Sequence, residues 1–150
     1  MRALIQRVTS GKVTTGGKVI GEIGQGYVIL LGVREGDIET EAELLASQTV
    51  NLRVMSDSED KMNKSILDVG GEILVISQFT LYADPSAGRR PSFLQAAKPE
   101  LANKLYIHFI SQLKKLRVKN VQAGEFGAYM SVSLVNDGPV TIMLDTNHLF

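Results

Sequence analysis

The first third of the chain carries hydrophobic patterns that are typical of β-strands. Residues 2–10 are rich in β-forming side chains, and Gly16 and Gly17 mark a tight hairpin turn because glycine tolerates the positive φ that such turns require. In residues 19–23, alternate positions point to one face of the next strand. Residues 26–33 are apolar on both faces, which predicts a central strand that is covered on both sides.

Two amphipathic helices are predicted further along. The first begins at Asp37, a favourable N-cap, and Glu39 and Glu41 suit the positive end of its dipole. The second begins near Pro99, because proline is tolerated in a first helical turn. The buried stripes at helical spacing are Ile38, Ala42, Leu45 and Thr49 in the first helix, and Leu101, Leu105, Phe109, Leu113 and Leu116 in the second.

The remaining strands lie after each helix. Residues 73–76 form a short apolar run that predicts a buried strand, and a long loop rich in Gly, Pro, Ser and Arg follows it. Residues 129–135 alternate between apolar and polar positions, and residues 140–145 form a second apolar stretch. These patterns predict an α+β fold: a single domain over residues 1–150, with a curved sheet or part-barrel and two main helices packed on one side.

The composition narrows the class of protein. Of 150 residues, 44% are hydrophobic and 21% charged, which suits one soluble domain. No stretch approaches the ~18–20 apolar residues of a membrane span, so no membrane partner is expected. Cysteine is absent, which excludes disulfides and thiolate chemistry and fits a cytoplasmic location. The net charge is zero, so an RNA partner would be held by a local patch.

The familiar catalytic and metal-binding patterns are missing from the sequence. A Ser-His-Asp triad needs a histidine near a serine, but His108 lies between apolar residues of a predicted helix and His148 lies near the C-terminus. No histidines or carboxylates have metal-ligand spacing, and no glycine-rich phosphate loop precedes a helix. We therefore expect no metal and no other cofactor.

Two polar segments remain as candidates for a site. Residues 77–80 follow the buried strand directly and precede a long loop, a common place for sites. Their hydroxyl groups would equally satisfy backbone groups at a strand end, and spacing alone favours that role. Residues 136–141 separate two apolar stretches and would equally form a plain hairpin. Composition does not separate these alternatives.

The two segments together carry a resemblance. The motif SQFT at residues 77–80 and the motif NDGPVT at residues 136–141 resemble the Ser-Gln-x-Thr and Asn-x-Gly-Pro-x-Thr motifs of the D-aminoacyl-tRNA deacylase family. The stretches MRALIQRV, SQFTLYAD, GRRPSF and FGAYM also look like this family. One such motif would be weak evidence, whereas two in order, in a chain of family-like length, are a specific signal.

The resemblance implies an enzyme that hydrolyses the ester between a D-amino acid and the 3′ end of tRNA, a chiral proofreading step. If selection works by exclusion of L side chains, glycyl-tRNA is expected to be cleaved as well, because hydrogen fits either place. It implies a homodimer in which a cis Gly138-Pro139 motif reaches into the partner's active site and excludes L side chains. Aminoacylated tRNA and a second copy of the chain are the implied partners. A non-catalytic module that binds RNA ends, or a hydrolase of another small ester, stays open as an alternative.

The resemblance also implies roles for individual residues. Ser77, Gln78, Phe79 and Thr80 form the catalytic lining, and backbone N–H groups near Phe79 and Thr80 are the oxyanion donors. Thr80 is either a nucleophile or a group that orients the substrate; the second is favoured because no activating histidine or lysine is evident.

The other implied residues bind the substrate. Phe126 and Met130 form a wall against adenine or ribose, Gly138 and Pro139 contact the α-amino group, and Arg7 braces their loop. Arg89 and Arg90 are the expected contacts to tRNA phosphates, because Lys114, Lys115 and Arg117 are explained by the dipole of the second helix.

Overall fold

The computed structural model describes residues 1–149, which form eight strands, two α-helices and two short 3₁₀ helices. The strands are β1 (Arg2–Thr15), β2 (Lys18–Ile23), β3 (Gly26–Gly32), β4 (Met55–Ser56), β5 (Met62–Lys64), β6 (Glu72–Ser77), β7 (Asn120–Ala123) and β8 (Ser131–Asp145). The helices are α1 (Glu39–Asn51), η1 (Phe79–Tyr82), α2 (Pro99–Lys115) and η2 (Thr146–His148).

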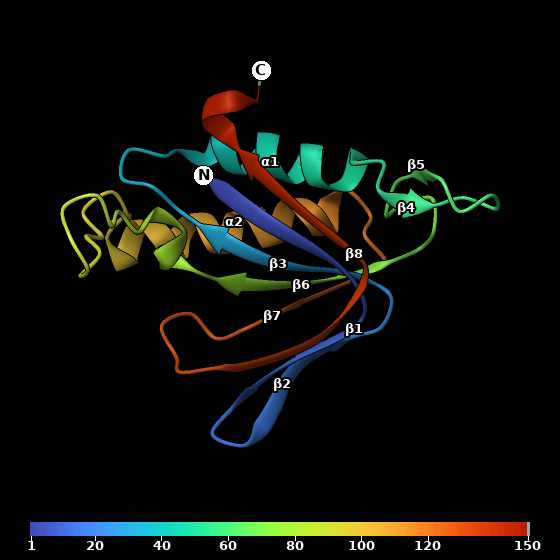
Figure 1. Cartoon of the computed structure of the whole chain (residues 1–150), viewed down its shortest axis with the longest axis horizontal. Coiled ribbons are helices and arrows are strands. Elements are labelled where there is room, and N and C mark those ends of the chain that lie inside the picture. The colour runs from blue at the N-terminus through green and yellow to red at the C-terminus, as the bar shows by residue number, and fades with distance from the viewer. Residues whose placement is uncertain (150) are drawn as a thin grey trace.

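One curved sheet organises the molecule (Figure 1). β3 is antiparallel to the first half of β1 and parallel to β6, and β6 is parallel to β7. The second half of β1 pairs with β2, and β8 runs along the other edge of β1. The sheet curls until β2 approaches β7. The two strands are so close that a Cβ at Gly21 would lie 3.1 Å from the carbonyl oxygen of Ala123. The predicted curved sheet of an α+β fold is therefore confirmed.

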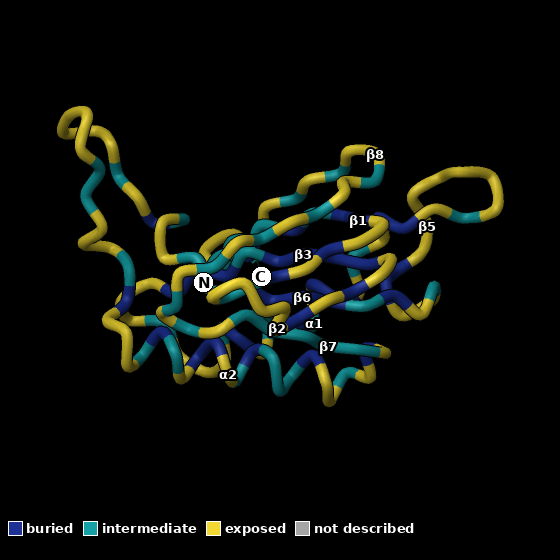
Figure 2. The backbone as a smooth tube through the Cα atoms, turned by 90° about the horizontal axis from the view of Figure 1, so that it is seen from below, coloured by how far each residue is buried: buried dark blue, intermediate teal, exposed yellow. Residues whose placement is uncertain are grey.

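The alternation of side chains along the central strands separates two cores. Tyr27 and Ile29 of β3 point toward both helices and form the helix-side core with Ile73 of β6. Val28 and Leu74 point the other way and form the inner core, enclosed by the curl of the sheet. Figure 2 shows β3 and β6 almost entirely buried, as predicted for residues 26–33 and 73–76. Both helices pack on the helix-side core, so the predicted one-sided arrangement is confirmed.

The hairpin considered for residues 136–141 is wrong. β8 is one continuous strand that stays paired with β1 on both sides of this segment. Gln6 is opposite Thr141 and Val8 is opposite Asn136, so the residues between them on β8 bulge out across from the single residue Arg7. The bulge also changes the packing: before it Met130, Val132 and Leu134 contact the inner core, and from its last residue onward Val140, Ile142 and Leu144 contact the helix-side core.

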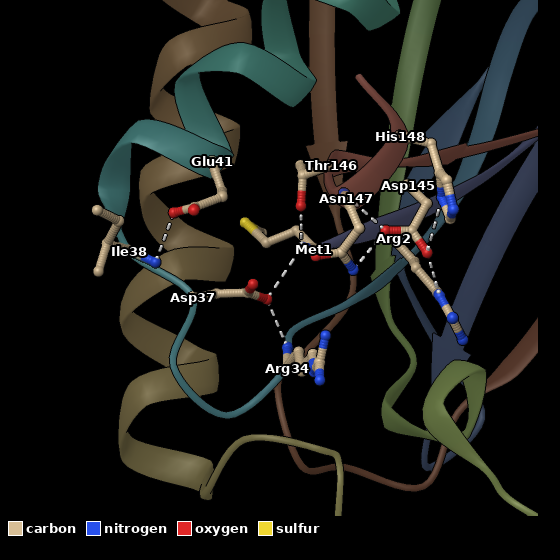
Figure 3. A network of polar contacts seen from close by, with 10 residues as sticks. All are labelled: Met1, Arg2, Arg34, Asp37, Ile38, Glu41, Asp145, Thr146, Asn147 and His148. Carbon is tan, nitrogen blue, oxygen red and sulfur yellow. Dashed lines mark hydrogen bonds and ion pairs between the residues drawn. The ribbon is translucent and has the colours of Figure 1, made fainter. Parts of the chain in front are cut away.

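The predicted N-cap of the first helix is also wrong. The N-cap of α1 is Ile38, whose N–H donates to the Glu41 carboxylate at 2.8 Å. The carboxylate of Asp37 instead accepts from the N–H of Arg34 at 2.6 Å and pairs with the N-terminal ammonium of Met1 at 3.0 Å. Figure 3 shows Asp37 between these two partners. Ile38 is consequently exposed rather than part of the buried stripe, because it lies outside the helix.

Among residues 1–149, no helix is both long enough and apolar enough to cross a membrane.

Candidate functional site

A cavity of about 600 Å³ opens where the three parallel strands end. The carboxyl ends of β3, β6 and β7 lie at one edge of the sheet, and the first turn of α2 covers that edge. The volume of the cavity falls within the range of small-molecule sites. The lining residues come from the last residues of β3 and β6, the segments that follow β3, β6 and β7, the loop before α2, the first turn of α2 and the start of β8: Leu31, Val33, Ile76, Ser77, Gln78, Phe79, Phe93, Ala96, Ala97, Pro99, Ala102, Phe126, Gly127, Ala128, Tyr129, Met130 and Val132.

The segment of residues 77–80 passes from the end of β6 into the cavity wall. The N–H of Gln78 donates to the carbonyl oxygen of Leu31 at 2.8 Å, which extends the parallel pairing by one residue. The chain then turns into η1, so the N–H groups of Phe79 and Thr80 have no acceptor within that short helix. The side-chain amide of Gln78 donates to the hydroxyl of Thr80. Ser77, Gln78 and Phe79 line the cavity, whereas Thr80 lies on the exposed side of the turn.

Phe126 and Met130 form the facing wall of the cavity. The ring of Phe126 packs against the ring of Tyr106 from α2, with 6.0 Å between the centroids. Met130 lies directly over Gly124, where a Cβ would come within 2.6 Å of its sulfur. A glycine at position 124 therefore lets the methionine side chain approach the backbone closely.

Tyr106 holds the base of this wall, a role that the helical pattern did not predict. Its buried hydroxyl donates to the carbonyl oxygen of Val75 at 2.9 Å and lies 3.2 Å from that of Gly124. Burial raises the pKa of this phenol to about 12, so the hydroxyl keeps its proton at neutral pH. A tyrosine on a buried helix face is the signal that was available, because its hydroxyl needs a partner there.

The loop between η1 and α2 forms part of the mouth of the cavity. Phe93 of this loop contacts Phe79 edge to face, with the ring centroids 5.0 Å apart. More than half of the Phe79 side chain, 53%, stays exposed at this rim. Arg89 and Arg90 lie on the same loop and are exposed. The same loop therefore carries both a lining residue of the cavity and two exposed cationic side chains.

Gly138 and Pro139 lie elsewhere, in the bulge of β8. Both are exposed, neither lines the cavity, and the peptide bond between them is cis. Arg7 faces Tyr27 at the start of β3, whereas the cavity residue Leu31 lies near the end of the same strand. Because Tyr27 and Leu31 are four residue steps apart on an extended strand, the bulge and the cavity are ~13 Å apart along the sheet.

Arg7 holds the bulge. Its Nε donates to the carbonyl oxygen of Asp137 at 3.0 Å and lies 3.4 Å from the Asp137 carboxylate. A second nitrogen donates to the carbonyl oxygen of Val54 at 2.7 Å. Only 8% of Arg7 is exposed, so these bonds form away from bulk water and fix the residue that precedes Gly138.

Comparisons with known proteins show the family of the chain. The model of the D-Tyr-tRNA(Tyr) deacylase family matches residues 4–145. The chain belongs to this family. A "D-aminoacyl-tRNA deacylase" of Roseiflexus castenholzii is 58% identical over 97% of this chain and 92% of its own length. The protein of the same name from Thermosipho melanesiensis is 51% identical over the full length of both chains.

Solved structures also resemble this member of the deacylase family. A protein described as "c-Myc DNA Unwinding Element Binding Protein" superposes with a TM-score of 0.91 at 44% identity, covering 97% of this chain and 98% of the other. A "probable eukaryotic D-amino acid tRNA deacylase" superposes with a TM-score of 0.81 at 16% identity, covering 95% and 97% of the two chains. The second likeness supports the fold alone.

The histidines of this deacylase family member lie away from the cavity. His108 is on the outer side of α2, 3.1 Å from the Glu43 carboxylate of α1. His148 lies in η2 and is 82% exposed. Neither residue lines the cavity, and the described residues contain no group of three or more metal-ligating side chains that could hold an ion. The site within residues 1–149 therefore consists mainly of backbone groups, amide and hydroxyl groups, and apolar walls.

Proposed function

We propose that the protein hydrolyses the ester between a D-amino acid and the 3′-terminal adenosine of tRNA, releasing the free amino acid and the tRNA. The observation that carries this proposal is the position of residues 77–79 in the wall of the cavity, in a chain of the D-Tyr-tRNA(Tyr) deacylase family. The cavity of about 600 Å³ is large enough for an aminoacyl-adenosine end. The apolar wall of Phe126 and Met130 suits adenine and ribose.

In this mechanism water attacks the ester carbonyl and the carbonyl oxygen becomes an oxyanion. The N–H groups of Phe79 and Thr80 donate to that oxyanion, since neither has an acceptor within η1. The bond to the ribose oxygen then breaks, that oxygen takes one proton of the attacking water, the second proton passes to solvent, and the amino acid leaves as a carboxylate. An aminoacyl ester is intrinsically reactive, so positioning of water with help from the adjacent ribose hydroxyl supplies the remaining acceleration.

Thr80 acts as an orienting group in this proposal rather than as a nucleophile. Its hydroxyl accepts a hydrogen bond from the Gln78 amide, and no histidine or lysine of residues 1–149 hydrogen-bonds it. A threonine hydroxyl without a base is a weak nucleophile. The amide of Gln78, a residue that lines the cavity, instead sets the direction of this hydroxyl on the exposed side of the turn.

The site is completed by a second copy of the chain. Gly138 and Pro139 are exposed, far along the sheet from the cavity of their own subunit, and fixed by Arg7. A rigid exposed segment of this kind suits insertion into the cavity of a partner subunit, where its carbonyl oxygens accept from the α-amino group of the substrate. Arg89 and Arg90, on the loop at the cavity mouth, contact the tRNA phosphates. The protein acts in the cytoplasm, where charged tRNA is used.

A turnover assay tests the proposed activity. Incubation with tRNA charged with labelled D-tyrosine is expected to release the label catalytically, well above the spontaneous rate. A Gln78→Ala variant is the control and is expected to be inactive, because it keeps the backbone but loses the contact to Thr80. Binding of the charged tRNA without release of label would favour the RNA-end binding module. A protein that neither binds the charged tRNA nor releases the label would contradict the proposal.

A mixed-subunit experiment tests the shared site. Gly138→Ala introduces a Cβ within 2.9 Å of the Val140 side chain and 3.2 Å of the Arg7 guanidinium, so it distorts the bulge. Gly138→Ala and Gln78→Ala homodimers are each expected to be inactive. After co-refolding, half of the dimers are mixed and each holds one intact site, so about a quarter of wild-type activity is expected to return. Verified mixed dimers without activity would rule out a site completed by the partner.

A further inference from the structure

The turn that carries residues 77–80 is held from outside the cavity. η1 rests on the end of β3, where a Cβ at Gly32 would lie 3.1 Å from the Cβ of Leu81 and 3.2 Å from the carbonyl oxygen of Gln78. Within η1 itself, the turn is held by backbone hydrogen bonds between residues three apart, such as the one from the Leu81 N–H to the Gln78 carbonyl oxygen at 3.3 Å. A four-residue 3₁₀ helix with such bonds needs support from the rest of the molecule to keep one conformation.

Arg2 supplies that support through three contacts of one guanidinium. Its Nη1 donates to the carbonyl oxygen of Leu81 at 2.8 Å, and its plane lies 4.6 Å from the centroid of the Tyr82 ring. Its Nε donates to the Asp145 carboxylate at 2.8 Å. Figure 3 shows Arg2 reaching from the start of β1 toward Asp145 at the end of β8. Arg2 also pairs with Gly32 across β1 and β3, so both residues that hold η1 lie at one position of the sheet.

The chemistry of these contacts requires arginine. A planar guanidinium donates in two fixed directions while its face stacks on an aromatic ring, whereas a lysine ammonium is a single point charge. The side chain of Asp145 is only 10% exposed and accepts from the N–H of Asn147 as well, so it holds the guanidinium in one orientation. The burial of Tyr82 gives the stacked ring a fixed place.

We propose that Arg2 is a positioning residue for the oxyanion-binding turn: the Asp145–Arg2–Leu81 chain holds the N–H groups of Phe79 and Thr80 in their catalytic direction. This inference rests on the proposed function for its kinetic part. Arg2 itself does not line the cavity, so it acts through η1 and not by contact with the substrate.

The test compares Arg2→Ala and Arg2→Lys with a matched control, Arg53→Ala. Arg53 also donates through Nε to a backbone carbonyl, that of Asn63 at 2.7 Å, but it lies just before β4, its acceptor is in β5, and it does not line the cavity. With D-tyrosyl-tRNA, Arg2→Ala is expected to lower kcat roughly ten- to a hundredfold, because a small misplacement of a catalytic group has that effect. KM is expected to stay within about twofold, since the walls that bind the adenosine are unchanged.

Arg2→Lys is expected to stay close to Arg2→Ala, because lysine keeps the charge but not the fork, and Arg53→Ala is expected to keep wild-type kcat. Amide hydrogen exchange provides a readout without substrate: the N–H groups of Leu81 and Ala83, which bond within η1, are expected to exchange faster in Arg2→Ala only. A folded Arg2→Ala protein with wild-type kcat and unchanged exchange, or full recovery in Arg2→Lys, would overturn the proposal. If the wild type lacks deacylase activity, the exchange result alone still decides whether Arg2 holds η1.

Discussion

A Gly26→Ala variant is expected to lose the folded structure. Gly26 begins β3 opposite Glu72 of β6, and a Cβ at this position would lie 1.8 Å from the carbonyl oxygen of Glu72. Its φ of +157° is also one that L side chains rarely adopt. The clash is with backbone on the central parallel pair of the sheet, so it cannot be relieved by a rotamer change. We expect a loss of more than about 4 kcal/mol in the free energy of unfolding, a large part of the stability of a typical domain.

Gly24→Ala is the matched control, two residues earlier in the chain. A Cβ there would meet nothing within 4 Å, so the free energy of unfolding should change by no more than about 0.5 kcal/mol. Urea denaturation followed by far-UV circular dichroism measures both variants, and soluble yield gives a first indication. A Gly26→Ala protein that unfolds at the wild-type midpoint would mean that β3 and β6 pair differently from the arrangement described.

Discrimination between D- and L-aminoacyl-tRNA is expected to reach at least a thousandfold. If the backbone of the partner's Gly138 and Pro139 holds the α-amino group and residues 77–80 hold the ester, two of the four Cα substituents are fixed. The side chain of a D-amino acid then points outward, and that of an L-amino acid points into the Gly-Pro backbone. A thousandfold ratio needs only about 4 kcal/mol, at 1.36 kcal/mol per tenfold, which a clash with rigid backbone supplies.

This scheme excludes L side chains and does not recognise D side chains individually. It predicts that D-tyrosyl- and D-aspartyl-tRNA are both cleaved, and that glycyl-tRNA is cleaved as well because hydrogen fits either place. Deacylation rates of D-tyrosyl-, D-aspartyl-, L-tyrosyl- and glycyl-tRNA, measured side by side, test it. Complete inertness toward glycyl-tRNA at high enzyme concentration would indicate a pocket that reads the D side chain directly, and exclusion would no longer explain the selectivity.

The parts of the fold that were predictable from the sequence are those that local patterning determines. The two-sided apolar run of β3 and the stripe of α2 each report the burial of their own segment. The bulge of β8 was not predictable in this way, because Asn-Asp-Gly-Pro suits a hairpin turn as well as a bulge. Its pairing depends on β1, which lies at the other end of the sequence. Asp37 was wrongly assigned as a cap for a similar reason: it pairs with the N-terminal ammonium of Met1, and a local sequence pattern does not reveal a partner so far away along the chain.

The sequence predicted those residues of the candidate site that belong to motifs. It did not predict the residues whose place in the site depends on tertiary packing. Residues 77–79, Phe126 and Met130, which the resemblance implied for the site, line one cavity, and their catalytic and binding roles stay predictions. Tyr106 and Phe93 were missed because a helical apolar residue and a loop aromatic have many ordinary roles. Their contribution becomes visible only when the strand ends, the loop and α2 meet in three dimensions.

The pairing of β1 with β8 sets an order of events during protein synthesis. β1 leaves the ribosome before β8, and β8 follows only after the intervening strands and helices. At ordinary elongation rates this delay is roughly ten seconds. The bulge with Gly138 and the Asp145 partner of Arg2 both belong to that last strand. A nascent chain therefore has neither the exposed Gly138-Pro139 segment nor the Asp145 partner of Arg2, and both arrive together when β8 adds the final edge of the sheet.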